Sequence, residues 1–200
     1  MAVKSDINIR MISKFTGILL MILTFFMAIS AIWSWYYKET EALRAILMAS
    51  GITFFSGLAL FLITRKSDHR NIGKKEGYFI VTLTWLSISA FGALPFYLYH
   101  TIPSYTDAFF ETISGFTTTG ATVIIDIEGV SKGLLFWRSM THWLGGMGII
   151  VLTLAILPVL GVGGMQLFVA EAPGTTPSRL HPRIAETAKR LWGIYFMLTA

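Results

Sequence analysis

Charged residues are scarce in this 200-residue sequence, and cysteine is absent. The lack of cysteine excludes disulfides and thiolate metal sites. Only 14% of the residues are charged and 54% are hydrophobic, whereas a soluble domain carries about 25% charged residues. This composition argues against a soluble domain and predicts an integral membrane protein whose surroundings are a lipid bilayer.

Long apolar runs divide the chain, and each is long enough to cross the roughly 30 Å hydrocarbon core of a membrane. They cover residues 15–37, 45–64, 77–106 and 133–160, and a further run starts near Leu191. Pro95 is expected to kink or end the third run. Ala28-Ile29-Ser30 is a small-x-small sequence typical of signal-peptide cleavage, but the length of the first run favours an uncleaved helix. The predicted fold class is an all-α, multi-pass membrane protein.

The basic residues lie in short loops between these runs rather than on a polar domain, so no nucleic-acid partner is predicted. Twelve of the 16 Lys and Arg residues fall in residues 1–14, 65–77 and 161–190. Because basic residues are enriched in cytoplasmic loops, this asymmetry predicts a cytoplasmic N-terminus. Six of the eleven acidic residues fall on the opposite, outer side, where they either concentrate cations or form a solvated rim: Glu39, Glu41, Asp107, Glu111, Asp126 and Glu128.

A shorter segment, residues 104–125, separates the third and fourth runs and is too short and too polar to span a bilayer. Ser104 is a good N-cap, and Asp107 three residues later completes a capping box. Gly115 is a natural stop because glycine takes positive φ without steric cost. The sequence therefore predicts a helix over about 104–115, followed by an extended Thr/Gly segment over about 117–122.

This arrangement has two interpretations. A helix that stops halfway through a membrane leaves its last carbonyls unpaired, which is tolerated only inside protein or beside a water-filled cavity. The carbonyls of the extended segment can then replace the hydration shell of a cation. The alternative is an ordinary polar loop between two spans, with Thr and Gly as turn residues.

The fourth run carries the other candidate residues. Arg138 and His142 lie four residues apart on one face near its outer end, and a pair that snorkels to the interface is favoured over a functional role. Gly145, Gly146 and Gly148 are expected to allow close approach of another helix or of the Thr/Gly segment. The histidines have no metal-ligand spacing and no Ser/His/Asp arrangement stands out, so an enzyme is not predicted.

Four stretches carry a resemblance to a known family: FFETISGFTTTGATV, WRSMTHWLGGMGII, ILPVLGVGGMQLFVAEA and RIAETAKRLW, over residues 109–123, 137–150, 156–172 and 183–192. In this order and spacing they resemble the first M1–pore helix–filter–M2 unit of a Trk-type potassium uptake subunit, of the Trk/Ktr/HKT superfamily. The resemblance implies two N-terminal transmembrane helices (1–70), one pore unit (71–165), and a cytoplasmic loop with the start of the next M1 helix (166–200).

The resemblance also implies an activity. The backbone carbonyls of Thr118, Thr119 and Gly120 would coordinate potassium ions, with Thr117 and Ala121 beside them. It implies potassium uptake by symport in the inner membrane of a bacterium, a homodimer, and a peripheral nucleotide-binding regulatory subunit. Compared with the potassium-channel filter T-V-G-Y-G, the segment keeps only the Thr and the first Gly, as this family's reduced filter does.

The length departs from the family pattern. A transporter of this family holds four such units around a single pore, and this chain contains one. Four filter walls are needed to replace a hydration shell. The alternative function is therefore a non-conducting truncated fragment, or a membrane scaffold or assembly protein.

Overall fold

The computed structural model describes residues 9–65, 74–148 and 181–199, and within them all regular secondary structure is helical. Helices α1 (Ile9–Tyr36) and α2 (Thr40–Thr64) form an antiparallel hairpin joined by Tyr37–Glu39. Helix α2 begins earlier than the predicted residue 45, because its polar first turn continues the helix beyond the apolar run. The two helices pack closely at Gly17 and Gly57. A Cβ atom added at Gly17 would lie only 2.7 Å from the Gly57 carbonyl oxygen.

The third apolar run is not one helix. Helix α3 (Lys74–Gly92) stops, Ala93 follows, and α4 (Leu94–Leu98) continues with Pro95 in its first turn. Proline has no N–H to donate to the preceding turn, so the predicted break at Pro95 is confirmed. The helical part ends at Leu98 rather than near residue 106. Within the described ranges, three stretches are long and apolar enough to cross a membrane: α1, α2 and Val81–Leu98.

The remaining helices are α5 (Tyr105–Phe116), α6 (Lys132–Trp143), the π-helical turn η1 (Leu144–Gly148) and α9 (His181–Thr199). The fourth run does not continue as a straight helix, because Gly146 has a non-helical ψ of −114°. The predicted end of that run, the matching stretch 156–172 and the loop up to residue 180 lie outside the described residues. Helix α9 begins ten residues before the predicted start at Leu191.

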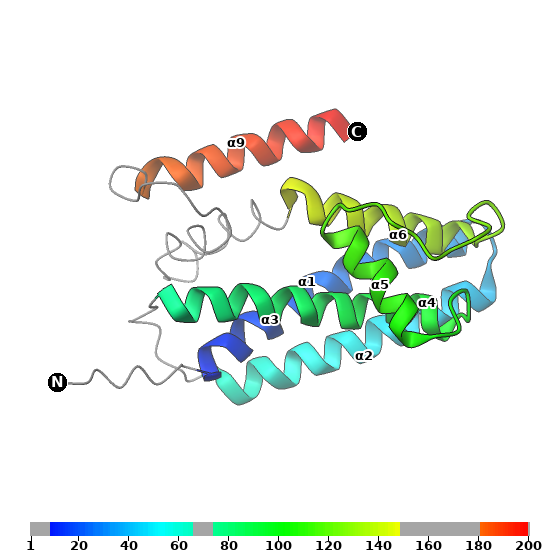
Figure 1. Ribbon diagram of the computed structural model, residues 1–200, viewed down its shortest axis with the longest axis horizontal. Coiled ribbons are helices and arrows are strands. Elements are labelled where there is room, and N and C mark those ends of the chain that lie inside the picture. Colours follow the sequence, from blue (N-terminus) through cyan, green and yellow to red (C-terminus); the bar gives the residue numbers. More distant parts are fainter. Residues whose placement is uncertain (1–8, 66–73, 149–180, 200) are drawn as a thin grey trace.

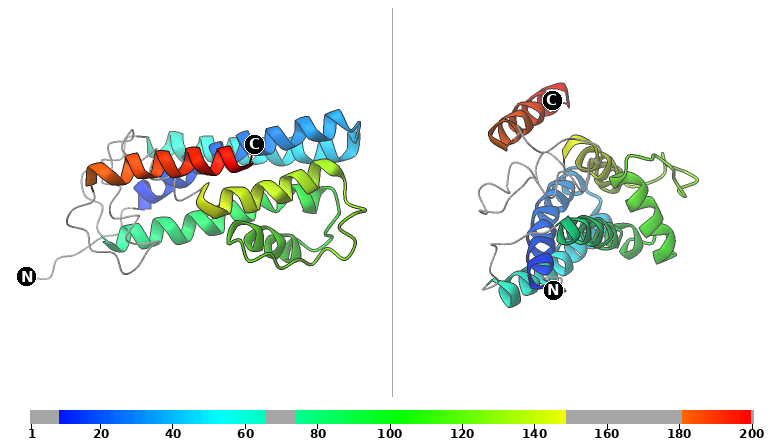
Figure 2. Two further views of the ribbon diagram at one scale, coloured as in Figure 1. Left: turned by 90° about the horizontal axis from the view of Figure 1, so that it is seen from above. Right: turned by 60° about the vertical axis from the view of Figure 1, so that its left-hand side comes forward.

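Helices α1, α2, α3 and α6 run alongside one another, and the shorter α5 lies obliquely against α3 and α6 (Figures 1 and 2). The α1–α2 turn and the segments that flank α5 lie at one end of this bundle, on the right in Figure 1. The starts of α3 and α9 lie at the other end. Trp137 is fully buried where these helices meet, and its Nε1 donates to the Gly92 carbonyl oxygen at 2.9 Å.

Glu39 links the N-terminal hairpin to α6. Its two carboxylate oxygens accept from the backbone N–H groups of Lys132 and Gly133, at 2.7 and 3.1 Å. These are the first N–H groups of α6, which have no partner within the helix. The negative charge also complements the positive end of the helix dipole. Glu39 is therefore a cap supplied from a distant part of the chain, and not only a charge at the outer rim.

This cap predicts a stability effect. Glu39→Ala leaves two helix-terminal N–H groups without their acceptor, and we expect it to lower the free energy of unfolding by about 1–2 kcal/mol. Glu41→Ala is the matched control, because Glu41 is exposed and its one ion pair with a described residue is with Arg44 on the same helix. Thermal unfolding of the detergent-solubilised protein measures both. Equal midpoints for the two variants would contradict the capping role.

Candidate functional site

Helix α5 is positioned by contacts at both ends. At its start, Ser104 Oγ accepts from the Asp107 backbone N–H at 3.4 Å, as predicted, although the reciprocal bond of a capping box is absent among the described residues. The Tyr105 hydroxyl donates to the Ala90 carbonyl oxygen of α3 at 2.9 Å. Partial burial raises the pKa of Tyr105, so its hydroxyl keeps the proton that it donates at neutral pH.

Gly115 does not stop the helix. Helix α5 continues to Phe116, and Gly115 instead packs against the Thr141 side chain of α6, where a Cβ would clash with the Thr141 hydroxyl. The residue with a left-handed conformation is Thr118, with φ of +56°. The prediction of Gly115 as the stop was wrong because a small residue at this position serves helix packing rather than chain reversal.

The end of α5 is closed by a Schellman motif around Thr118. The Thr118 N–H donates to the Gly115 carbonyl and the Thr119 N–H to the Ser114 carbonyl, both at 2.9 Å. The carbonyls of Ile113, Ser114 and Gly115 are therefore paired by the chain itself, which corrects, for these three residues, the prediction that the last carbonyls of the helix would be left unpaired. Left-handed backbone is unfavourable for a β-branched residue, so Thr118 is a strained position held by these bonds.

The five residues predicted to coordinate a cation follow one another along this turn. They are all exposed in the single chain: Thr117, Thr118, Thr119, Gly120 and Ala121. Gly120 also has positive φ, at +78°. The Ala121 carbonyl accepts from Ser114 Oγ at 2.6 Å and is thereby turned toward α5. The carbonyls of Thr118, Thr119 and Gly120 receive no hydrogen bond from the described part of the chain, which leaves their oxygens available.

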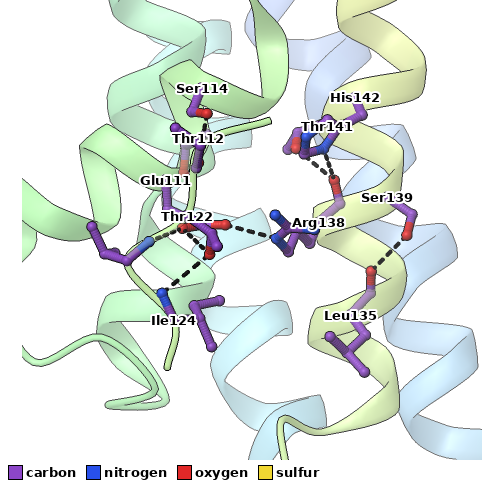
Figure 3. Close-up of polar contacts among 12 residues, drawn as sticks. Glu111, Thr112, Ser114, Thr122, Ile124, Leu135, Arg138, Ser139, Thr141 and His142 are labelled. Carbon is purple, nitrogen blue, oxygen red and sulfur yellow. Dashed lines mark hydrogen bonds and ion pairs between the residues drawn. The ribbon is translucent and has the colours of Figure 1, made fainter. Parts of the chain in front are cut away.

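A buried ion pair between α5 and α6 contacts the chain just after these five residues, at positions 122–123 (Figure 3). The Glu111 side chain is 1% exposed, and its Oε1 accepts from Arg138 Nε of α6 at 2.7 Å. Its Oε2 accepts from Thr122 Oγ1 at 2.8 Å and from the Val123 N–H at 2.9 Å. One carboxylate thus joins α5, the extended segment and α6.

Two predictions made from the sequence were wrong here. Glu111 is not part of an outer acidic rim, and Arg138 does not snorkel to the interface. His142 does not share the ion pair, because its Nδ1 contacts the Arg138 carbonyl of its own helix at 3.0 Å. A signal for Glu111 existed in the sequence: it lies at helical spacing with Ala108 and Gly115, which are both buried.

Gly145 lies against the other side of the helix end. A Cβ on Gly145 would lie 2.6 Å from the Phe116 carbonyl carbon, so the two backbones are in direct contact. The prediction that this glycine allows close approach of another helix or of the Thr/Gly segment is confirmed for a helix, because Phe116 is the last residue of α5. Gly146 approaches α9 instead, with a Cβ position 2.9 Å from the Tyr195 hydroxyl.

An open cleft of about 460 Å³ lies beside the C-terminal end of the extended segment. Asp107 and Asp126 line it, and Asp126 Oδ1 accepts from the Gly129 N–H at 3.1 Å. Over the described residues, no group of three or more acidic or histidine side chains could hold a metal ion.

Known proteins resemble this chain along almost its whole length. The model of the family described as "TrkH: Cation transport protein" matches residues 43–200. The Trk system potassium uptake protein TrkH of Salmonella typhimurium is 43% identical over 96% of this chain and 40% of its own length. The Trk system potassium uptake protein TrkG of Escherichia coli is 33% identical over 96% of this chain.

A solved structure shows the same fold. The crystal structure of the potassium transporter TrkH from Vibrio parahaemolyticus matches with a TM-score of 0.75 and 38% identity. The match covers 96% of this chain and 38% of that chain. The chain therefore spans about two fifths of the length of the relatives and of the solved structure that it matches.

Proposed function

The chain belongs to the TrkH family of cation transport proteins, and from this premise we propose that it forms one wall of a potassium-uptake pore. The transported ion is potassium, which is substrate rather than cofactor. The membrane is the cytoplasmic membrane of a bacterium. Potassium uptake is the activity in the names of the relatives, and three apolar helices suited to a bilayer support it.

The observation that carries this proposal is the exposed backbone of Thr118, Thr119 and Gly120 at the end of a short oblique helix. In the proposed arrangement α3 with α4 is M1, α5 is the pore helix, and α6 with η1 begins M2. The hairpin of α1 and α2 precedes this unit, and α9 belongs to the next M1. These three carbonyls are the proposed ligands. Ala121 contributes less because its carbonyl is bonded to Ser114.

Uptake of potassium tests the proposal directly. The complete gene product is expressed in cells that lack their own potassium-uptake systems, and radioactive rubidium or potassium influx is followed. We expect growth at low potassium and saturable influx. A scaffold or assembly protein predicts membrane insertion without influx, and that result would overturn the proposed function. From the family resemblance we further propose that the transporter is a homodimer that binds a nucleotide-binding regulatory subunit. Co-purification of the assembled transporter tests both contacts.

The proposed orientation gives a separate prediction. With a cytoplasmic N-terminus, a reporter fused at Glu128 is expected outside and one fused at position 75 inside. The structure places residues 124–131 and the start of α3 at opposite ends of the bundle, which supports opposite sides (Figure 1). Alkaline phosphatase and fluorescent-protein fusions measure this. The same compartment for both fusions would contradict the arrangement.

A further inference from the structure

We propose that Glu111 and Arg138 are positioning residues that hold the outer end of the filter segment and thereby set ion discrimination. The proposal rests on the proposed function. Neither residue is assigned to ion binding, because Glu111 is buried and its carboxylate is already shared among partners. The pair acts through the backbone of residues 121–123, which follows directly on the proposed ligands.

The ion pair between Glu111 and Arg138 does not by itself require the contacts that Glu111 makes with residues 122–123. A buried carboxylate is strongly unfavourable unless it is paired and hydrogen-bonded, and Arg138 Nε supplies the pairing charge at 2.7 Å. A pair that only joined α5 to α6 would use both carboxylate oxygens on the arginine, as carboxylate–guanidinium pairs often do. Here Oε2 accepts instead from Thr122 Oγ1 and the Val123 N–H. One of the two carboxylate oxygens of Glu111 therefore binds residues 122–123 rather than the arginine.

Hydrogen bonds fix the filter segment, residues 117–122, at two points that are only a few residues apart. At its start, the Thr119 N–H bonds to the Ser114 carbonyl. At its end, the Ala121 carbonyl accepts from the Ser114 hydroxyl, and residues 122–123 donate to Glu111. Gly120 lies between the two anchors: its N–H donates to the Ser114 carbonyl oxygen at 3.5 Å, and a Cβ at this position would meet no atom within 4 Å. A shift of the Glu111 anchor is therefore transmitted to the carbonyls of Thr119 and Gly120.

The hydrogen-bond network extends beyond the carboxylate. Thr122 Oγ1 donates to Glu111 and accepts from the Ile124 N–H at 3.1 Å. Removing this hydroxyl leaves the Glu111–Arg138 ion pair intact but loosens the segment. Thr122→Val is therefore a probe that separates positioning of the filter from packing of α5 on α6, since valine keeps the β-branched shape of threonine and lacks only the hydroxyl.

The experiment compares variants of the complete gene product in the uptake assay, with potassium and sodium influx measured separately and membrane abundance determined by immunoblot. We expect Thr122→Val to lower the potassium-to-sodium ratio about two- to tenfold, the effect of losing one typical hydrogen bond. Thr122→Ser keeps the hydroxyl and restores the ratio. Glu111→Gln and Arg138→Gln lower it further, and Glu41→Gln, which affects an exposed pair, leaves it unchanged.

A charge exchange sharpens the test. Glu111→Arg combined with Arg138→Glu restores opposite charges between α5 and α6, but arginine cannot accept from the Val123 N–H. Positioning predicts that the exchanged variant is inserted yet discriminates poorly. A restored ratio in the exchanged variant, or a parental ratio in Thr122→Val at normal abundance, would overturn the positioning role while the proposed function stands. Absence of influx in the parent protein would overturn the proposed function itself.

Discussion

Gly120→Ser is expected to weaken potassium uptake and to reduce discrimination against sodium, with membrane insertion unchanged. Gly120 has φ of +78°, a conformation that costs an L-residue about 1–2 kcal/mol. A Cβ at this position meets no atom within 4 Å, so the change causes no clash in the chain. The expected effect therefore comes from the backbone: serine favours a negative φ, which turns the proposed carbonyl ligands away from the ion.

Uptake kinetics at several potassium and sodium concentrations measure this effect. We expect a loss of potassium-to-sodium preference of about five- to thirtyfold, corresponding to 1–2 kcal/mol. Gly51→Ser in α2 is the matched control, because a Cβ there also meets nothing and its backbone has no positive φ. We expect both variants to insert normally, because transfer of the apolar helices into the bilayer supplies the free energy of insertion. Parental preference in Gly120→Ser would show that this segment is an ordinary outer loop.

Local patterns in the sequence predicted the helices well. The all-helical membrane fold, the N-cap at Ser104 and the break at Pro95 depend on residues close together in the chain. Each is decided by hydropathy, by a side chain that reaches its own first turn, or by a missing N–H group. The helix bounds differ from the predicted ones where polar turns extend a helix past its apolar run, as at Thr40.

The errors concern contacts between distant residues. Glu39 caps a helix that begins 93 positions later, and Glu111 pairs with a residue 27 positions away. Both carboxylates were predicted only as outer charges. The helix cap at Glu39 and the buried ion pair at Glu111 were missed, because position along the chain does not reveal a tertiary partner. Gly115 was misassigned for the same reason, since its role is set by Thr141 of another helix. The coordination by residues 117–121 remains a prediction, because it depends on neighbouring walls and on an ion.

Gly145 gives the other large expected effect, because its backbone is in direct contact with Phe116, the last residue of α5 before the Thr/Gly segment. A Cβ at Gly145 would lie 2.7 Å from Phe116 Cα and 2.6 Å from its carbonyl carbon. Phe116 cannot retreat easily, since its ring is fully buried and a Cβ at Gly92 of α3 would lie 3.1 Å from that ring. The end of α5 is thus held between α3 and η1, and an added side chain must displace one of them.

Gly145→Leu is therefore expected to reduce potassium uptake at least tenfold, because the displaced Phe116 carries the start of the Thr segment with it. Overpacking of this kind costs about 1–3 kcal/mol or more, so we also expect a lower thermal unfolding midpoint in detergent. Gly145→Ala is expected to lower both the potassium uptake and the unfolding midpoint by less than Gly145→Leu does. Gly193→Ala in α9 is the control, since a Cβ there meets nothing within 4 Å. Normal uptake and an unchanged midpoint in Gly145→Leu would mean that η1 and α5 are not held in this contact, and that the filter segment is positioned by the Glu111 side of the helix alone.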